Sequence, residues 1–187
     1  MNMALRYYAS WHPMQASDAA EVLGHVIGDF FDDKLRELRE LFGPMLAISQ
    51  AMCDSFKQEL LEGKHNFMVG GNNMKCALYV AAATLGNGTT AYTAANEVAN
   101  GNGYTTTGKT LTNVNPTLSG AVAFTDFADL AWTASTFTAR GALIYNDDAA
   151  DRAVAVLDFG ADKTVTSGTF TIVFPAAAAG TAILRLT

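Results

Sequence analysis

Positive charge is scarce in this sequence of 187 residues, which has 12 Lys and Arg against 18 Asp and Glu and a net charge of −6. No cluster of basic residues occurs anywhere along the chain. Proteins bind the phosphates of DNA and RNA mainly through Lys and Arg, so this composition argues against nucleic acid as a partner.

Long apolar runs and cysteines are also scarce. No run approaches the roughly 20 residues that a membrane helix needs, and the opening residues lack the succession of regions typical of a signal peptide. We therefore expect no membrane partner, and a protein that is made and kept, or assembled, in the cytoplasm. The two cysteines, Cys53 and Cys76, are too few for a disulfide framework and have no metal-site spacing, so both are expected to be reduced.

The chain has two halves of different composition, with a boundary near Asn66. Residues 1–67 hold 10 of the 18 acids and all three histidines, whereas the remainder is rich in Thr, Ala, Gly and Asn. This predicts a helical arm with a linker helix in residues 1–67 and a separate domain in residues 68–187.

Apolar residues with helical spacing predict the linker helix, from about Pro44 to Glu62. They recur every three or four residues and share one face, which must be buried on the chain's own sandwich or on a partner chain. Pro44 suits the first helical position, and Gly63 is placed for a left-handed C-terminal cap. The face consists of Met45, Ile48, Met52, Phe56 and Leu60.

A second helix is predicted from Asp18 to Leu41, where Asp18 and Glu21 form a pair that resembles a capping box. Gly24 and Gly28 weaken this helix. An isolated helix of this kind gains most of its stability from what it packs against, so we expect it to contact a neighbouring subunit. With Phe56 of the linker helix, the candidates for partner contacts are Val22, Val26, Phe30, Leu38 and Leu41.

From Met74 onward the apolar period changes to two, which is typical of strands. Strands are expected at Lys75–Ala82, Thr110–Leu118, Ala121–Phe127, Phe137–Tyr145, Ala153–Phe159, Thr169–Phe174 and Thr181–Leu186. Turn-forming clusters separate them, among them Asn146-Asp147-Asp148 and Ser167-Gly168. Seven or eight short strands without intervening helices predict a mainly β protein, an antiparallel, jelly-roll-like β-sandwich that carries the N-terminal α-helical arm.

Residues for enzymatic chemistry are few in the strand-rich half. No serine lies in a G-x-S-x-G elbow, no histidine follows His65, and neither Gly-Asn-Gly segment has the context of a phosphate-binding loop. Cys76 shares a strand face with Leu78 and Val80 and is expected in the core. Nothing in the spacing of Glu97, Asp126 and Asp129 indicates a glycosidase pair. We expect no catalytic residues, no cofactor and no enzyme.

Three carboxylates in one turn, Asp147, Asp148 and Asp151, are a candidate calcium site, because calcium prefers oxygen ligands. The turn lacks an EF-hand spacing and the glycine of such a loop, so a solvated turn capped by Asp side chains is the favoured interpretation. His65 is expected to hold the junction between helix and sheet by hydrogen bonds. Zinc is not indicated, because the histidines are scattered: His12, His25 and His65.

A series of short segments covers about residues 52–187 in a specific order. It begins with Cys53-Asp54-Ser55-Phe56-Lys57-Gln58-Glu59-Leu60-Leu61, Gly63-Lys64-His65-Asn66-Phe67 and Lys75-Cys76-Ala77-Leu78-Tyr79. It continues with Thr89-Thr90-Ala91-Tyr92, Asn96-Glu97-Val98, Gly103-Tyr104, Ala139-Arg140-Gly141-Ala142, Leu157-Asp158-Phe159-Gly160 and Phe170-Thr171-Ile172. In this combination the chain resembles a family of virion structural proteins of tailed double-stranded DNA bacteriophages. The first fifty residues depart from the family pattern, in which the Cys-x-Ser-Phe-Lys segment usually lies close to the start.

The resemblance implies a noncatalytic structural component of the virion, made in the host cytoplasm, and it brings no catalytic residues. The expected partners are other virion proteins, above all the major capsid protein, and further copies of the chain. A capsid cement or decoration protein that reinforces capsomer junctions is the leading interpretation. A tail, baseplate or head-to-tail connector component is the first alternative, and a carbohydrate-binding virion module is an alternative of another class.

Overall fold

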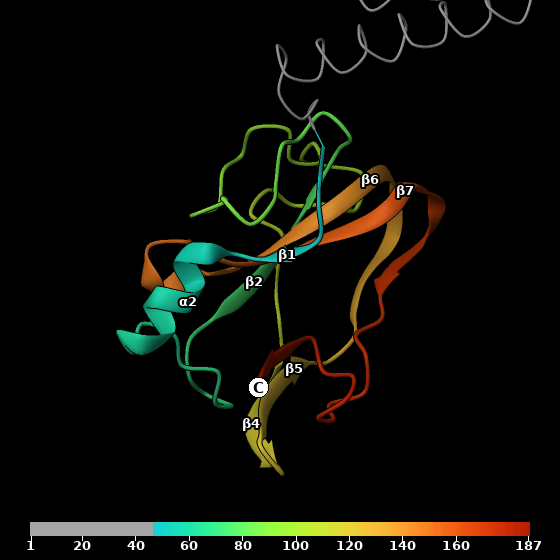
Figure 1. Cartoon of the computed structure of the whole chain (residues 1–187). Coiled ribbons are helices and arrows are strands. Elements are labelled where there is room, and N and C mark those ends of the chain that lie inside the picture. Colours follow the sequence, from blue (N-terminus) through green and yellow to red (C-terminus); the bar gives the residue numbers. More distant parts are fainter. Residues whose placement is uncertain (1–46) are drawn as a thin grey trace, which may run out of the picture. The chain divides into compact units, whose positions relative to one another are not determined.

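The structure, a computed structural model, describes residues 47–187. In this part of the chain two antiparallel sheets dominate (Figure 1), which confirms the mainly β class and is consistent with a β-sandwich. The helix predicted at Asp18–Leu41 lies outside the described residues. So do its candidates for partner contacts, Val22, Val26, Phe30, Leu38 and Leu41.

The larger sheet has five strands in the order β1-β7-β6-β2-β3. They are β1 (Ala51–Met52), β2 (Met74–Tyr79), β3 (Lys109–Thr110), β6 (Leu130–Asn146) and β7 (Arg152–Ile172). All residues of β2 except Lys75 are buried, because β2 is an inner strand and is covered on both faces. Cys76 is therefore a core residue, as its alternation with Leu78 predicts, and both cysteines are free.

The ribbon of β6 and β7 is much longer than expected from the sequence. The expected strand at Ala153–Phe159 and the one at Thr169–Phe174 are both part of one strand, β7, apart from the last two residues. The sequence does not reveal this continuity, because the pairing of β6 with β7 is irregular. Arg140 of β6 alone stands opposite residues 159–162 of β7, and the ribbon bends towards β5 (Figure 1). The turn expected at Ser167-Gly168 is wrong, since Ser167 has a φ of 47° inside β7 and marks an irregularity in the strand.

The smaller sheet has the order β4-β5-β8 and consists of β4 (Asn113–Ser119), β5 (Val122–Phe127) and β8 (Leu184–Leu186). The strand expected at Thr110–Leu118 is thus divided between the two sheets. The break is at Leu111, whose buried side chain and hydrogen bond to the Met74 carbonyl keep it with the larger sheet. Pro116 lies in β4, at a sheet edge, where its missing N–H is tolerated.

Helix α2 (Asp54–Leu61) is shorter than the helix expected at Pro44–Glu62. Before it, Ala51 and Met52 pair with β7 as strand β1, so the expected helix is wrong for residues 47–53. A short apolar run fits either period, and the available edge of β7 decides for a strand. The expected burial is confirmed at Ile48 and Phe56. Gly63 ends the helix with a φ of 67°, as predicted.

The core of residues 47–187 is one cluster that includes Phe56 of α2, and α2 contacts β7. Both β1 and α2, which the sequence assigned to the arm half, thus belong to the same compact unit as the two sheets. Trp132 is fully buried between Tyr104 and Phe170, which confirms its expected place in the core. The turn at Asn146-Asp147-Asp148 is also confirmed, as the short 3-10 helix η1 (Asp147–Ala149).

Candidate interaction site

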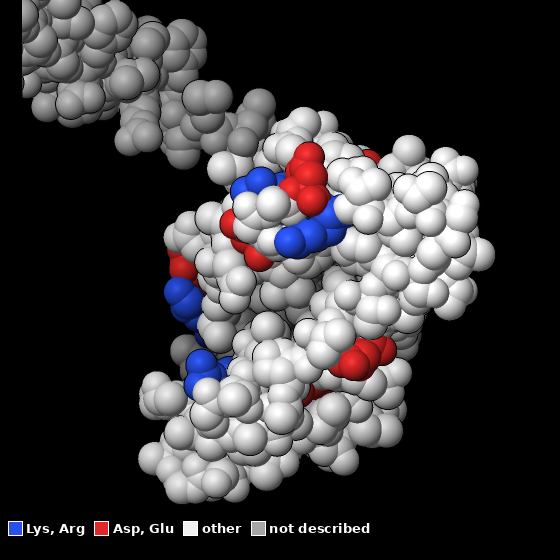
Figure 2. Space-filling view, turned by 90° about the vertical axis from the view of Figure 1, so that its right-hand side faces the viewer, with Lys and Arg blue, Asp and Glu red and all other residues white. Residues whose placement is uncertain are grey.

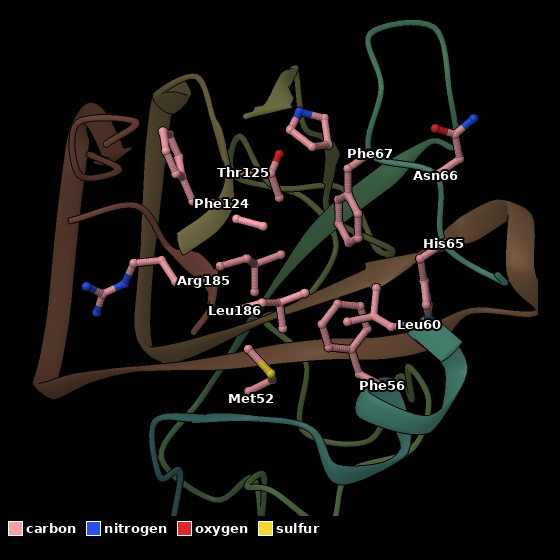
Figure 3. A pocket seen from close by; sticks show the side chains of 13 residues that line it. Met52, Phe56, Leu60, His65, Asn66, Phe67, Phe124, Thr125, Arg185 and Leu186 are labelled. Carbon is pink, nitrogen blue, oxygen red and sulfur yellow. The ribbon is translucent and has the colours of Figure 1, made fainter. Parts of the chain in front are cut away.

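An apolar hollow lies between α2 and the three-stranded sheet (Figure 3). Its volume is about 310 Å³. Phe56 and Leu60 from α2 and Phe67 from the following segment lie on one side, and β5 and β8 supply the other. Leu186 of β8 is 53% exposed, so part of this apolar surface is open to solvent.

Two further hollows adjoin the first. A hollow of about 240 Å³ shares Met52 and Leu184 with it, and a third, of about 520 Å³, shares Gln50, Leu157 and Ile183 with the second. Shared lining residues make the three hollows neighbours on the molecular surface. We call this row of hollows the edge groove, because β1 and β8, which both line it, are edge strands of their sheets.

The edge groove carries little charge. In its first two hollows Arg185 is the only lining residue with a permanent charge, and Asp158 and Lys163 line the far end. Apolar contact and backbone hydrogen bonding are therefore the chemistry that it offers. Exposed apolar surface with a polar rim is typical of binding sites for other polypeptides.

A row of apolar side chains crosses the smaller sheet beside the groove. Leu118 pairs with Ala123, which pairs with Leu186, so all three lie on one face of the sheet. Leu118 is 69% exposed and Leu186 is 53% exposed, so this face presents accessible apolar surface beside the groove.

His65 forms the buried polar wall behind the first hollow. Its Nδ1 accepts a hydrogen bond from Asn146 Nδ2 at 3.0 Å, so Nε2 carries the proton and donates to Glu59 Oε2 at 2.9 Å. Arg152 donates to the other oxygen of Glu59 at 2.7 Å. The hydrogen bonds tie α2 to the hairpin of β6 and β7, which confirms the expected role of His65 at the junction of helix and sheet.

These partners also decide what the His65 cluster can do chemically. Desolvation raises the pKa of Glu59, but the hydrogen bonds from His65 and Arg152 outweigh it, and the net pKa is lowered. Both ring nitrogens of His65 have partners, and its side chain is fully buried. The cluster therefore holds structure together, and it offers no free base to a substrate.

Phe56, a candidate for partner contacts in the sequence, lies in the chain's own core. It is 2% exposed, and its ring centroid lies 4.9 Å from that of His65 and 5.9 Å from that of Phe67. Of the two alternatives for the linker helix, packing on the chain's own sheets holds for Phe56. The apolar surface that is open to solvent is formed by residues that the sequence analysis did not select, such as Leu186.

The calcium candidates do not converge. Asp147 Oδ1 lies 3.3 Å from Lys75 Nζ, and Asp148 accepts a hydrogen bond from the Asn73 N–H at 2.8 Å. Within residues 47–187 no group of three or more His, Cys, Asp or Glu side chains is placed to hold a metal ion. The three residues lie in or beside the turn η1, but its side-chain cap is Asn146, whose Oδ1 accepts a hydrogen bond from the Asp148 N–H at 3.2 Å, and not an Asp side chain as the sequence suggested.

Glu97 is a residue whose role the sequence did not reveal. Its carboxylate accepts hydrogen bonds from the hydroxyls of Tyr92 and Tyr104, both at 2.6 Å, and from the N–H of Thr107 at 2.8 Å. Burial raises the pKa of both tyrosines above their ordinary range. Glu97 therefore holds the long loop between β2 and β3 in place. In the sequence, only the spacing of its aromatic neighbours indicates this role.

The described part of the chain has no helix long and apolar enough to cross a membrane. Comparisons with protein-family models, with curated proteins and with solved structures find no match to this chain.

Proposed function

We propose that the protein is a noncatalytic structural component of a tailed bacteriophage virion, and that it acts as a capsid cement or decoration protein. In this proposal the two sheets form a jelly-roll-like sandwich, and the first residues form a helical arm. The ordered series of segments between residues 52 and 187 supports the virion assignment. The observation that carries an assembly role is the edge groove, an open apolar surface on a domain poor in charge.

The surface supports the same proposal. Figure 2 shows broad areas of this face without Lys, Arg, Asp or Glu, and between them the few charged side chains lie in small groups, some of both signs and some of one sign. A neighbouring subunit can cover such a surface without burying unpaired charge, which would cost several kcal/mol per ion. A cement protein needs this property, because it binds where capsomers meet and stays there under the internal pressure of the genome.

Copy number distinguishes the cement role from a place in the tail, the baseplate or the connector. Quantitative mass spectrometry of purified virions, calibrated on the major capsid protein, measures it directly. Hundreds of copies per virion support a cement protein. Six or twelve copies support the tail or connector alternative, and absence from the virion refutes the proposal as a whole.

The arm is proposed to serve assembly more than folding. Residues 47–187 already contain a continuous buried core, so deletion of residues 1–43 should leave a soluble, β-rich protein that no longer forms oligomers or binds its virion site. Circular dichroism and light scattering measure both properties. Aggregation with loss of the β signal would show instead that the arm belongs to the core.

A carbohydrate-binding virion module remains the alternative of another class. Such modules stack sugar rings on exposed aromatic side chains, whereas the aromatic side chains of residues 47–187 are buried or half-buried. A glycan array tests the alternative. Binding that is lost on substitution of half-buried Phe159 or Phe170, with the fold intact, would favour it over the assembly role.

A further inference from the structure

The long loop between β2 and β3 contains all three Asn-Gly pairs of the sequence: Asn87-Gly88, Asn100-Gly101 and Asn102-Gly103. Such a pair is chemically reactive, because glycine leaves its own peptide nitrogen unshielded by a side chain and allows the backbone unusual freedom. The nitrogen can then attack the side-chain amide carbon, Cγ, of the preceding asparagine. The structure distinguishes the three pairs by how free this nitrogen is to react.

The second and third pairs are held by backbone hydrogen bonds. The Gly101 N–H donates to the Tyr104 carbonyl at 2.8 Å, and the Tyr104 N–H donates to the Gly101 carbonyl at 2.9 Å. Asn102 and Gly103 form the turn of this small hairpin, with φ of 50° and 86°. The Asn102 carbonyl also accepts a hydrogen bond from the Thr136 N–H at 2.9 Å. Both pairs therefore react only when this hairpin opens.

Asn87-Gly88 lies in a more open turn. The Thr89 N–H donates to the Gly86 carbonyl at 3.0 Å, so Asn87 and Gly88 are the two central residues of a four-residue turn. Both are exposed, and a Cβ added at Gly88 would meet no atom within 4 Å. Among residues 47–187 no acceptor is placed for the Gly88 N–H. The nitrogen that must attack is thus accessible and is not held by a hydrogen bond.

We propose that Asn87 is a site of spontaneous deamidation. The Gly88 nitrogen forms a bond to Asn87 Cγ, the bond from Cγ to Nδ2 breaks, and the Nδ2 group leaves as ammonia with the proton that Gly88 loses. The product is a five-membered succinimide ring. Water then adds to one of the two ring carbonyls and opens the ring to aspartate or isoaspartate. The reaction transfers no electrons to or from another molecule, and water is its only co-reactant.

The side chain that reacts is one that joins the loop to the first residue of α2. Asn87 Nδ2 donates to Asp54 Oδ2 at 2.8 Å, and the Asn87 carbonyl accepts a hydrogen bond from the Asp54 N–H at 2.8 Å. Lys57 Nζ donates to the other oxygen of Asp54, Oδ1, at 2.6 Å. The hydrogen bonds from Lys57 and Asn87 lower the pKa of Asp54, so its carboxyl group is charged at neutral pH.

Deamidation removes this contact in two ways. It replaces the amide donor of Asn87 by a second carboxylate, which repels the charged carboxylate of Asp54, with Lys57 as the cation that limits the repulsion. Formation of isoaspartate also routes the main chain through the former side chain, which displaces the carbonyl that accepts from the Asp54 N–H. The modification therefore loosens the loop from the start of α2.

Peptide mapping of the full-length chain by mass spectrometry tests the site. Folded protein and protein unfolded in urea are incubated in mildly alkaline buffer, and the fraction of each asparagine converted to aspartate or isoaspartate is measured over time. In urea the three pairs should react at similar rates. In the folded chain Asn100 and Asn102 should react about tenfold more slowly than Asn87, since breaking two backbone hydrogen bonds shifts the local equilibrium by about that factor. A folded chain in which Asn87 does not react first overturns the proposal.

Gly88→Ala tests the mechanism. The space around Gly88 is open, so the fold should be kept, whereas the added methyl group shields the attacking nitrogen. Conversion of Asn87 should fall to the level of Asn100 and Asn102. Gly180→Ala, which also meets no atom within 4 Å, is the matched control and should leave the conversion unchanged. Undiminished conversion of Asn87 in Gly88→Ala means that the Gly88 nitrogen is not the attacking group, and it overturns the proposal.

Asn87→Asp makes the charged product directly and tests its effect on α2. The melting temperature should fall relative to wild type, and more at low than at high salt, because salt screens the repulsion from Asp54. In an Asp54→Asn background the same substitution should cost nothing, since the two side chains again form a donor–acceptor pair. Equal effects in the two backgrounds overturn the link to α2. All these measurements use purified protein, so their outcome is independent of the virion assignment, which copy number decides.

Discussion

Truncation of Phe56 tests how far α2, the single α-helix among residues 47–187, contributes to stability. The Phe56 ring is 2% exposed and packs edge-on against His65 and Phe67, beside the first hollow of the edge groove. In Phe56→Ala the ring is lost, and with it the contact that holds α2 against the segment after it.

The expected cost follows from burial and from the position of the ring. Truncation of a buried Phe to Ala costs about 3 to 5 kcal/mol in the free energy of unfolding. The space left by Phe56 opens into the groove, where neighbouring side chains and water can enter, so we expect the lower end, about 3 kcal/mol. In a chain of this length that corresponds to a fall in the melting temperature of about 9 °C.

Urea unfolding followed by far-ultraviolet circular dichroism measures the change, with equal m-values as the condition for comparison. Leu61→Ala is the matched control, since Leu61 lies in the same helix but is 92% exposed and should cost less than about 0.5 kcal/mol. If Phe56→Ala is as stable as Leu61→Ala, α2 does not anchor the core, and the account of this junction is wrong.

Three further predictions concern the polar junction, one glycine and the acidic turn. The hydrogen bonds to Glu59 lower the pKa of its carboxyl group below the ordinary value of 4.5. The contribution of Glu59 to the stability of the fold is therefore complete above that value and is lost as the pH falls through the lower pKa of the folded state. Thermal melts between pH 5 and pH 2 should show a steeper loss of stability for the wild type than for Glu59→Gln. At Gly108, with a φ of 70°, an added Cβ would lie 1.9 Å from the Cys76 carbonyl oxygen, so Gly108→Ala should lower the melting temperature strongly. Gly88→Ala meets no atom within 4 Å and is its control. Neither EDTA nor Ca²⁺ should move the melting temperature, whereas a fall of several degrees in EDTA that Ca²⁺ reverses would identify Asp147, Asp148 and Asp151 as a metal site.

Several features of this protein follow from local sequence alone. Alternation with period two indicates the mainly β class and the burial of Cys76, and the cluster at Asn146 predicts the turn between β6 and β7. The junction role of His65 follows from its place between a helix end and the first strand. All of these depend on side-chain pattern and turn chemistry within a few residues, which a sequence displays directly.

The tertiary structure decided which strands pair and where an open surface remains. Ala51 and Met52 fit a helix as well as a strand, and only the edge of β7 settles the choice. The edge groove joins Met52 to Leu186, 134 positions further along the chain, by the difference of their numbers. Strand pairing and grooves depend on contacts between distant segments, and no local period records those contacts.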